Sequence, residues 1–217
     1  MKETDKLVIT ISRQIGSGGA YIGRLLAKRL DMFYADRAII RGAAEKLSVN
    51  DKAVAEREES VPGFWSSFVN ATCLYPDLYV PPVMLAPSDY ELFMAESEVI
   101  RRLAAERSVV IIGRLGFDVL KDHPARISVF LHASLDFRIE RYARLYEVSA
   151  KEAKKAVVKN DRQRKRYCRM FASVDPCNAT NYDLSIDTER IGSLEKAAEL
   201  ILKYIESVKG AEAKVQG

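Results

Sequence analysis

The stretch that most constrains the fold is Arg13–Ala20, which reads RQIGSGGA and has glycine at three of four positions from 16 to 19. A β-branched apolar run, Leu7–Ile11, precedes it. Four aliphatic residues recur at helical spacing after it: Ile22, Leu25, Leu26 and Leu30. The sequence therefore predicts a buried strand, a tight glycine turn and a helix in succession. Such a turn points backbone amides inward at the positive end of a helix dipole, which is an arrangement that binds phosphate.

The turn departs from the strict phosphate-loop pattern GxxxxGK[ST]. Gly18 holds the second glycine, but Arg13 stands where the first glycine belongs. Gly19 replaces the lysine and Ala20 replaces the hydroxyl residue. A turn of this kind could also be structural or could bind a dinucleotide, although GxGxxG is absent. We expect the nucleotide phosphates at Gly16, Ser17, Gly18, Gly19, Ala20 and Tyr21.

The remaining patterns predict an α/β fold with a parallel sheet and helices on both faces. Further strands are expected at 109–112, 127–131 and 182–187. Helices are expected at 37–48, 50–60, 88–107, 149–171 and 193–208, two of them opened by the capping boxes Ser88–Glu91 and Ser149–Glu152. Ligands of such sheets gather at the carboxyl ends of the strands. Here those ends carry Ser12-Arg13, Gly113-Arg114 and His132-Ala133.

The length of 217 residues, 48% of them apolar, suits one compact domain, which we expect over 1–208 with a loose tail at 209–217. Residues 61–87 combine five of the seven prolines with several aromatic side chains. That mixture is typical of a lid or a binding excursion rather than of a linker. A surface for self-association, and hence a homo-oligomer, is a competing interpretation.

Several classes of protein are disfavoured by composition. No run of about 18 apolar residues and no secretory leader is apparent, so we expect a cytoplasmic protein without a membrane partner. Three cysteines without a CxxC pair, accompanied by two histidines, are too few ligands at the wrong spacing for a zinc site. Cys73, Cys168 and Cys177 are therefore interpreted as ordinary thiols.

Positive charge is concentrated in residues 138–169, which hold twelve Lys/Arg against four Asp/Glu. Such a segment favours a polyanionic partner, either nucleotide phosphates or nucleic acid, or it is a solvated helix face. Few base-stacking aromatic side chains are interleaved with it, so no nucleic-acid partner is expected.

Three separated motifs occur in the order found in one family. Ile11–Gly19, Ile112–Arg114 and Asn160–Tyr167 together resemble the cytidylate kinase-like proteins, and the resemblance runs from about residue 7 to 205. It implies a P-loop NTPase fold with three αβα layers, an acceptor-binding subregion at about 37–100 and a lid at about 138–169. It also implies ATP and Mg²⁺ as cofactors, nucleotide substrates, and phosphoryl transfer to a nucleoside monophosphate, CMP or dCMP above others.

The resemblance also implies roles for individual residues. Arg114 would contact the nucleoside monophosphate, and Asp36 and Arg41 would lie at the acceptor site, with a one-residue gap around Arg37. Asp161 would orient one of the lid guanidinium groups or meet the acceptor, or it would simply form an ion pair on the surface.

Five arginines match those that flank and line the family's lid: Arg138, Arg141, Arg162, Arg164 and Arg166. Cations are required there because a transferring phosphoryl group spreads negative charge over its oxygens. On a helix, residues 162 and 166 share a face while 164 points nearly away. We therefore expect Arg138, Arg162 and Arg166 to be catalytic and Arg164 to be only solvated.

Loss of the loop lysine leaves two roles to fill. Arg13 or a lid arginine could supply the missing cation, and Ser17 is the nearest substitute for the Mg²⁺ ligand. Two other functions stay open at this point, namely a catalytically degenerate nucleotide-binding regulator and a kinase of another small molecule.

Overall fold

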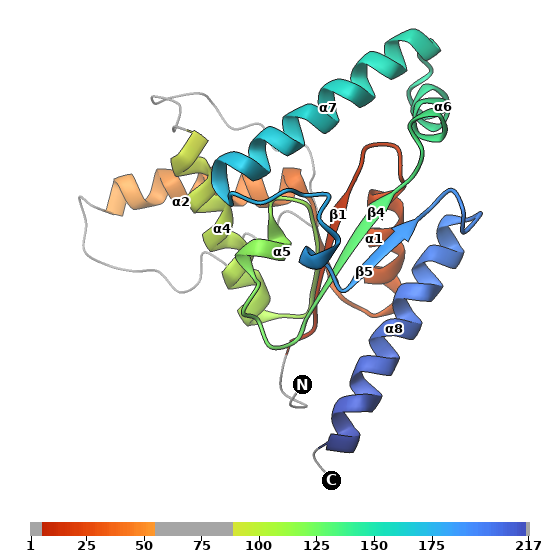
Figure 1. The fold of residues 1–217 in the computed structure, drawn as a ribbon. Helices are drawn as coiled ribbons and strands as arrows, with labels where there is room; N and C mark the ends of the chain where they lie inside the picture. Colours follow the sequence, from red (N-terminus) through yellow and green to blue (C-terminus); the bar gives the residue numbers. More distant parts are fainter. Residues whose placement is uncertain (1–5, 55–88, 216–217) are drawn as a thin grey trace.

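The computed structural model describes residues 6–54 and 89–215. Its centre is a five-stranded parallel sheet in the order β2-β3-β1-β4-β5 (Figure 1). The strands are β1 (Val8–Arg13), β2 (Phe33–Ala35), β3 (Val109–Ile112), β4 (Arg126–His132) and β5 (Leu184–Asp187). The predicted α/β class and the parallel sheet are confirmed.

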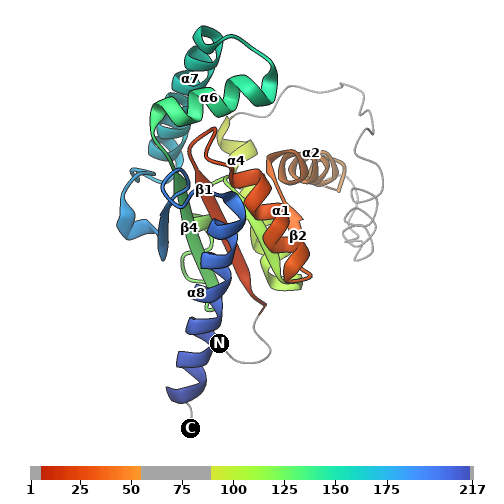
Figure 2. The same cartoon turned by 90° about the vertical axis from the view of Figure 1, so that its right-hand side faces the viewer.

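Helices cover both faces of this sheet, which makes three layers (Figures 1 and 2). On one face lie α1 (Gly19–Arg29) and α8 (Leu194–Val215). On the other lie α2 (Arg37–Val54), α4 (Asp89–Glu106) and the short α5 (Gly116–Val119). Beyond the carboxyl ends of the strands, α6 (Leu135–Tyr146) and α7 (Ala150–Phe171) form a helical pair, and a 3-10 turn at Ala179–Asn181 precedes β5.

Successive side chains of the central strands point to opposite faces of the sheet and pack into two apolar cores, one on each face. Ile9 and Ile11 of β1 pack with α1 and α8, whereas Val8 packs with α2 and α4. β3 divides in the same way, with Ile112 on the first face and Ile111 on the second. Because both faces are buried, these strands are mainly apolar runs, the pattern from which they were predicted.

The structure differs from the sequence-based prediction in several elements, and the predicted helix ranges include neither α5 nor α6. The predicted break between helices 37–48 and 50–60 is wrong as far as Val54, because α2 continues through Ser48 and Asn50. The predicted helix end at 208 is too early, since α8 extends to Val215. β2 was missed because a run of three residues is too short to show a period.

Residues 55–88, which include the predicted excursion at 61–87 and the cap residue Ser88, lie outside the described part of the chain. Within the described part, no helix is both long enough and apolar enough to cross a membrane.

Candidate active site

The glycine turn lies between β1 and α1, where two of its glycines take backbone angles that favour glycine. Gly16 has φ +86° and Gly18 has φ +85°. A Cβ on Gly16 would lie 2.7 Å from the carbonyl oxygen of Arg138, and a Cβ on Gly18 would overlap the Leu194 side chain. Both the backbone conformation and the close packing of α6 and α8 therefore require glycine at these positions.

No side chain of the described residues caps the N-terminus of α1. Gly18 is the N-cap, it supplies no side-chain hydrogen bond, and the first turn holds no acidic residue. In contrast, Ser134 and Ser149 cap α6 and α7, the latter in the predicted capping box with Glu152. The first amides of a helix lack intrahelical acceptors and carry partial positive charge. The α1 terminus is therefore available to an anion such as phosphate.

Two side chains of this region point away from the turn. The Tyr21 hydroxyl donates to Glu195 Oε1 at 2.6 Å, so this side chain contacts α8 and leaves the backbone as its possible contribution to phosphate binding. The Ser17 side chain is fully buried, and its Oγ lies 2.8 Å from the carbonyl oxygen of Gln14 and 3.1 Å from that of Leu131. The predicted role of Ser17 as a Mg²⁺ ligand does not fit this geometry, because the hydroxyl faces the sheet.

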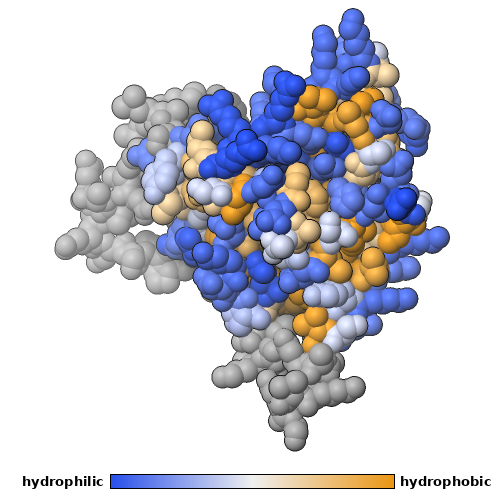
Figure 3. All heavy atoms as spheres, in the orientation of Figure 1, coloured by the Kyte–Doolittle hydropathy of each residue, from blue (hydrophilic) through white to orange (hydrophobic). Residues whose placement is uncertain are grey.

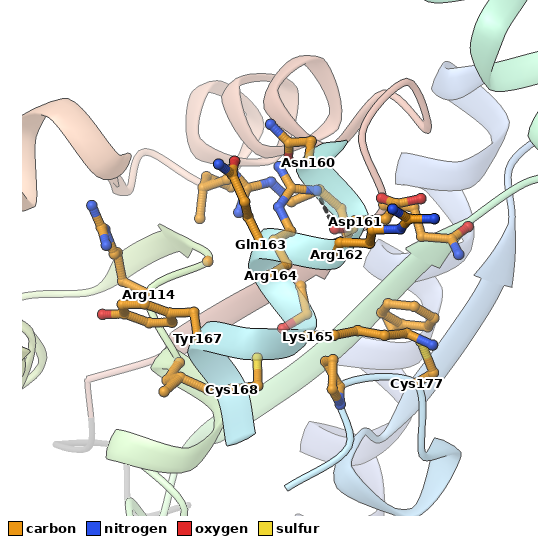
Figure 4. A pocket seen from close by; sticks show the side chains of 18 of the residues that line it. Arg114, Asn160, Asp161, Arg162, Gln163, Arg164, Lys165, Tyr167, Cys168 and Cys177 are labelled. Atoms are coloured by element: carbon orange, nitrogen blue, oxygen red, sulfur yellow. Dashed lines mark hydrogen bonds between the residues drawn. The ribbon is translucent and has the colours of Figure 1, made fainter. Parts of the chain in front are cut away.

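A cavity of about 680 Å³ opens beside the turn, between the carboxyl ends of β1 and β3 and the inner side of α7 (Figure 4). Hydrophilic residues dominate the surface over α7 (Figure 3). Among the described residues, the cavity is lined by one carboxylate, Asp161, and by seven cationic side chains: Arg13, Arg37, Arg114, Arg138, Arg162, Arg164 and Lys165. Such an excess of cations suits a ligand with several negative charges.

Arg138 connects α6 and α7 to the glycine turn. Its side chain is buried, and its Nη1 donates to Asp161 Oδ2 at 2.7 Å and to the carbonyl oxygen of Ile15 at 3.3 Å. Its Nε donates to the carbonyl oxygen of Ala133 at 3.1 Å. Of the three roles considered for Asp161, the structure supports the orientation of a guanidinium group, that of Arg138.

Arg164 faces the site and is not simply solvated, so that expectation is wrong. Its Nη1 donates to the carbonyl oxygen of Arg13 at 2.6 Å, and burial lowers the pKa of its guanidinium group. Arg162 also lines the cavity, but Arg166 does not and lies exposed on the outer side of α7. The helical spacing correctly places Arg164 on a different face of α7 from Arg162 and Arg166. However, the face of α7 that packs toward the site is the one that carries Arg164 (Figure 4).

The Arg13 side chain runs from the end of β1 into the cavity. Burial lowers the pKa of its guanidinium group, and the charge of Arg164 lowers it further. An arginine stays protonated at neutral pH even so. The structure thus concentrates a positive charge that an anionic ligand would stabilise.

Arg114 is held by two residues that the sequence-based analysis missed. Glu96 of α4 is 1% exposed, and its Oε1 lies 3.2 Å from Arg114 Nη2. The Arg114 guanidinium group lies over the Tyr167 ring, 5.4 Å from the centroid, and the Tyr167 hydroxyl donates to Glu96 Oε2 at 3.2 Å. Burial raises the pKa of the Glu96 carboxyl group and raises that of the Tyr167 hydroxyl to about 12. A glutamate on the apolar face of a predicted helix is the signal that could have identified Glu96.

The turn that presents Arg114 contains three successive residues with positive φ. Gly113, Arg114 and Leu115 have φ values of +75°, +53° and +55°. Non-glycine residues adopt this region at a cost of about 1 kcal/mol or more each, and such residues cluster at functional sites. Packing of buried Leu115 and the ion pair of Arg114 hold the turn in place.

The remaining acceptor-site candidates separate in the structure. Asp36 accepts hydrogen bonds from the amides of Ala38 and Ile39 at 3.0 and 3.3 Å, so it caps α2. Arg41 pairs with Glu45 at 2.9 Å on α2 and does not line the cavity. Arg37 lines it instead, and the charge of Arg114 lowers the pKa of its guanidinium group. Arg41 therefore does not reach the cavity that Arg37 lines, and its role at the acceptor site stays a prediction.

Solved structures with similar folds include kinases. The chain matches an uncharacterised protein from Eubacterium ventriosum ATCC 27560 with a TM-score of 0.68 at 23% identity, covering 93% of this chain and 99% of that one. It matches shikimate kinase from Bacteroides thetaiotaomicron with a TM-score of 0.51 at 12% identity, covering 92% and 98% of the two chains. These likenesses establish the fold alone.

Sequence relatives carry one shared description. A cytidylate kinase of Pyrococcus horikoshii is 28% identical over 187 residues, covering 86% of this chain and 82% of the relative. A cytidylate kinase of Thermosipho melanesiensis is 28% identical over 215 residues, covering 91% and 95%. The model of the cytidylate kinase-like family matches residues 8–190, and the chain therefore belongs to that family.

Proposed function

We propose that this protein transfers the γ-phosphoryl group of ATP to a nucleoside monophosphate, with CMP or dCMP as the favoured acceptor. The observation that carries the proposal is the charge of the cavity, where seven cationic side chains face one carboxylate among the described residues. This cavity adjoins the uncapped N-terminus of α1 through Arg13, which lines the cavity and lies against Gly19, so two surfaces that suit phosphate are adjacent. Binding the polyphosphate of ATP at one and a monophosphate at the other would bring the reacting groups together.

The chemistry of the cavity favours a phosphate acceptor over an alcohol. An alcohol must lose a proton as it attacks, which calls for a base near the acceptor oxygen. The carboxylate among the described lining residues, Asp161, is bonded to Arg138. A phosphate monoester needs no such base because its second pKa is about 6, so it is mainly a dianion at neutral pH.

The proposed step is a direct in-line transfer. An oxygen of the acceptor phosphate attacks the γ-phosphorus, the bond to the β–γ bridging oxygen breaks, and ADP leaves with that electron pair. The amides from residue 16 onward would hold the donor phosphates, while Arg114 and Arg37 would bind the acceptor phosphate. Arg164 and Arg162 of α7 would neutralise charge that develops on the transferred group.

The described part of the chain offers little to hold Mg²⁺ directly. Ser17 Oγ is turned to backbone carbonyl groups, and the described residues contain no cluster of three or more Asp, Glu, His or Cys side chains suited to a metal. We propose that the chain's own groups bind and orient the nucleotide, and that Mg²⁺ carried on the phosphates of ATP would supply charge neutralisation.

The proposal is tested by a coupled assay with ATP and Mg²⁺ across CMP, dCMP, UMP, AMP and GMP, with shikimate and gluconate as alcohol acceptors. We expect turnover with CMP or dCMP, consistent with the relatives described as cytidylate kinases. Folded protein that phosphorylates none of the nucleotides would refute the activity. Turnover with an alcohol and with none of the nucleotides would mean that the acceptor is an alcohol rather than a nucleoside monophosphate.

A second function is favoured by one observation, the glycine at position 19 where P-loop kinases carry a lysine. A chain that has lost this cation could bind nucleotide and act as a regulator. Calorimetry that detects ATP binding, combined with an absence of turnover across the acceptor panel, would support this function over the kinase.

A further inference from the structure

The Arg13 side chain occupies the space that a larger residue at position 19 would need. A Cβ added to Gly19 would lie 2.8 Å from Arg13 Cγ and 3.0 Å from Arg13 Cβ. These atoms belong to the base of the arginine side chain, which cannot swing aside without moving the whole group. Any larger residue at position 19, lysine included, therefore displaces Arg13.

The far end of the same side chain lies against a second glycine. A Cβ on Gly113 would overlap Arg13 Nη1, and Gly113 has a positive φ of +75°. Gly19 and Gly113 thus leave a slot from the end of β1 to the end of β3, and the Arg13 side chain lies in it. The slot leads into the cavity, which both Arg13 and Gly113 line.

The sequence shows what has changed at these positions. In the pattern GxxxxGK the first glycine and the lysine are six positions apart, and they correspond to Arg13 and Gly19 here. The chain therefore carries a cation where the pattern has glycine, and glycine where the pattern has its cation. The close approach of Arg13 to Gly19 means that a side chain at position 19 and the Arg13 side chain cannot both be held in their present positions.

We propose that Arg13 and Gly19 are a matched exchange, in which the Arg13 guanidinium group binds the β- and γ-phosphates of ATP in place of the lysine. Gly19 provides the space for that side chain. This inference rests on the proposed function, because it assumes that the glycine turn holds ATP. Arg164 positions Arg13 by donating to its carbonyl oxygen at 2.6 Å.

The test is a double-mutant cycle of Arg13→Gly, Gly19→Lys and the double variant, which rebuilds GxxxxGK. Calorimetry measures the affinities for ATP, ADP and AMP, and the coupled assay measures kcat and KM. We expect each single variant to lower kcat/KM for ATP by about 100-fold, the size of effect for removing one preorganised charge-stabilising group. The double variant should recover at least about 10-fold over either single variant, because its lysine supplies the cation without a clash.

Two further variants keep the test decisive. Ser207→Lys is the matched control, because Ser207 is exposed on α8 and does not line the cavity, and it should leave nucleotide affinity unchanged. Arg13→Met keeps the packing of the stem over Gly19 but removes the charge, and it replaces Arg13→Gly if that variant does not fold. A purely structural role of Arg13 predicts that Arg13→Met binds ATP, ADP and AMP with the wild-type preferences.

The outcomes separate this inference from the proposed function. Wild-type protein without turnover, whose preference for ATP over AMP disappears in Arg13→Met, would refute the kinase and support the role of Arg13. Wild-type turnover that Arg13→Met leaves unchanged would support the kinase and overturn the exchange. Effects that simply multiply in the double variant would also overturn it, and wild-type protein that binds no ATP would refute both proposals.

Discussion

The buried guanidinium group of Arg138 donates to Asp161 Oδ2 at 2.7 Å and thereby ties α6 to α7 beside the glycine turn. Replacing Asp161 with asparagine leaves this cation without its counter-charge in a buried setting, which is destabilising. We expect Asp161→Asn to lower the free energy of unfolding by about 2 kcal/mol, measured by urea denaturation.

A matched control is Glu98→Gln, which removes the carboxylate of the exposed Arg102–Glu98 pair on α4. Exposed pairs of this kind contribute about 0.5 kcal/mol or less. Equal losses in the two variants would mean that the Arg138–Asp161 bond has no special structural role.

Arg164 should matter more for catalysis than Arg162. Arg164 is half-buried and bonded to the carbonyl oxygen of Arg13, whereas Arg162 is exposed at the cavity edge. We expect Arg164→Ala to lower kcat/KM by about 100-fold and Arg162→Ala by clearly less, because a preorganised cation stabilises developing charge best. Arg169→Ala, a cation removed from the exposed part of α7, should have no effect on steady-state kinetics. A larger loss in Arg162→Ala than in Arg164→Ala would restore the interpretation from helical spacing alone.

The fold could be predicted because its main strands carry their own signal. β1, β3 and β4 are buried on both faces and therefore appear as mainly apolar runs, and Ser149 with Glu152 marks the start of α7. β2 could not be predicted because it has only three residues, which are too few to show a pattern. They become a strand by pairing with three residues of β3.

The site was predicted less completely than the fold. Helical spacing shows which residues of a helix share a face, but it does not show which face packs against the rest of the protein. The inner stripe of α7 is marked by the buried residues Ala153, Val157 and Cys168. Arg164 lies seven residues after Val157 and four before Cys168, so it belongs to that stripe. Reading the stripe from its apolar members would have placed Arg164 inside. Glu96 and Tyr167 could not be assigned in this way, since their partnership with Arg114 depends on the packing of α4 against α7's end.

Glu96 should make the stability of the protein depend on pH. Burial raises the pKa of this carboxyl group above its usual value of 4.5, although the charges of Arg114, Arg41 and Arg37 and a hydrogen bond from Tyr167 oppose the shift. The folded protein then binds the proton more tightly than the unfolded chain does. The contribution is therefore fully present below the usual pKa and is lost as pH rises through the raised value.

We expect Glu96→Gln to remove this part of the pH dependence. The measurement is the urea midpoint between about pH 4 and 7, with Glu98→Gln as the control that removes an exposed carboxylate from the same helix. A Glu96→Gln variant with an unchanged slope would show that Glu96 does not titrate in this window.

The two described cysteines should differ in reactivity although both line the cavity. Cys168 is buried, and burial raises the pKa of its thiol to about 11, so about one molecule in a thousand carries the thiolate at pH 8. Cys177 is exposed, so iodoacetamide should reach it first. In a Cys73→Ser background, mass spectrometry of timed digests should show Cys177 labelled well before Cys168, and both labelled at similar rates in urea. ATP with CMP should slow labelling of Cys177 if the cavity is the nucleotide site. Labelling of Cys168 first would contradict the packing of α7 against α5 that buries this thiol. The reactive thiolate forms only where water reaches the sulfur, so early labelling would mean that Cys168 is exposed.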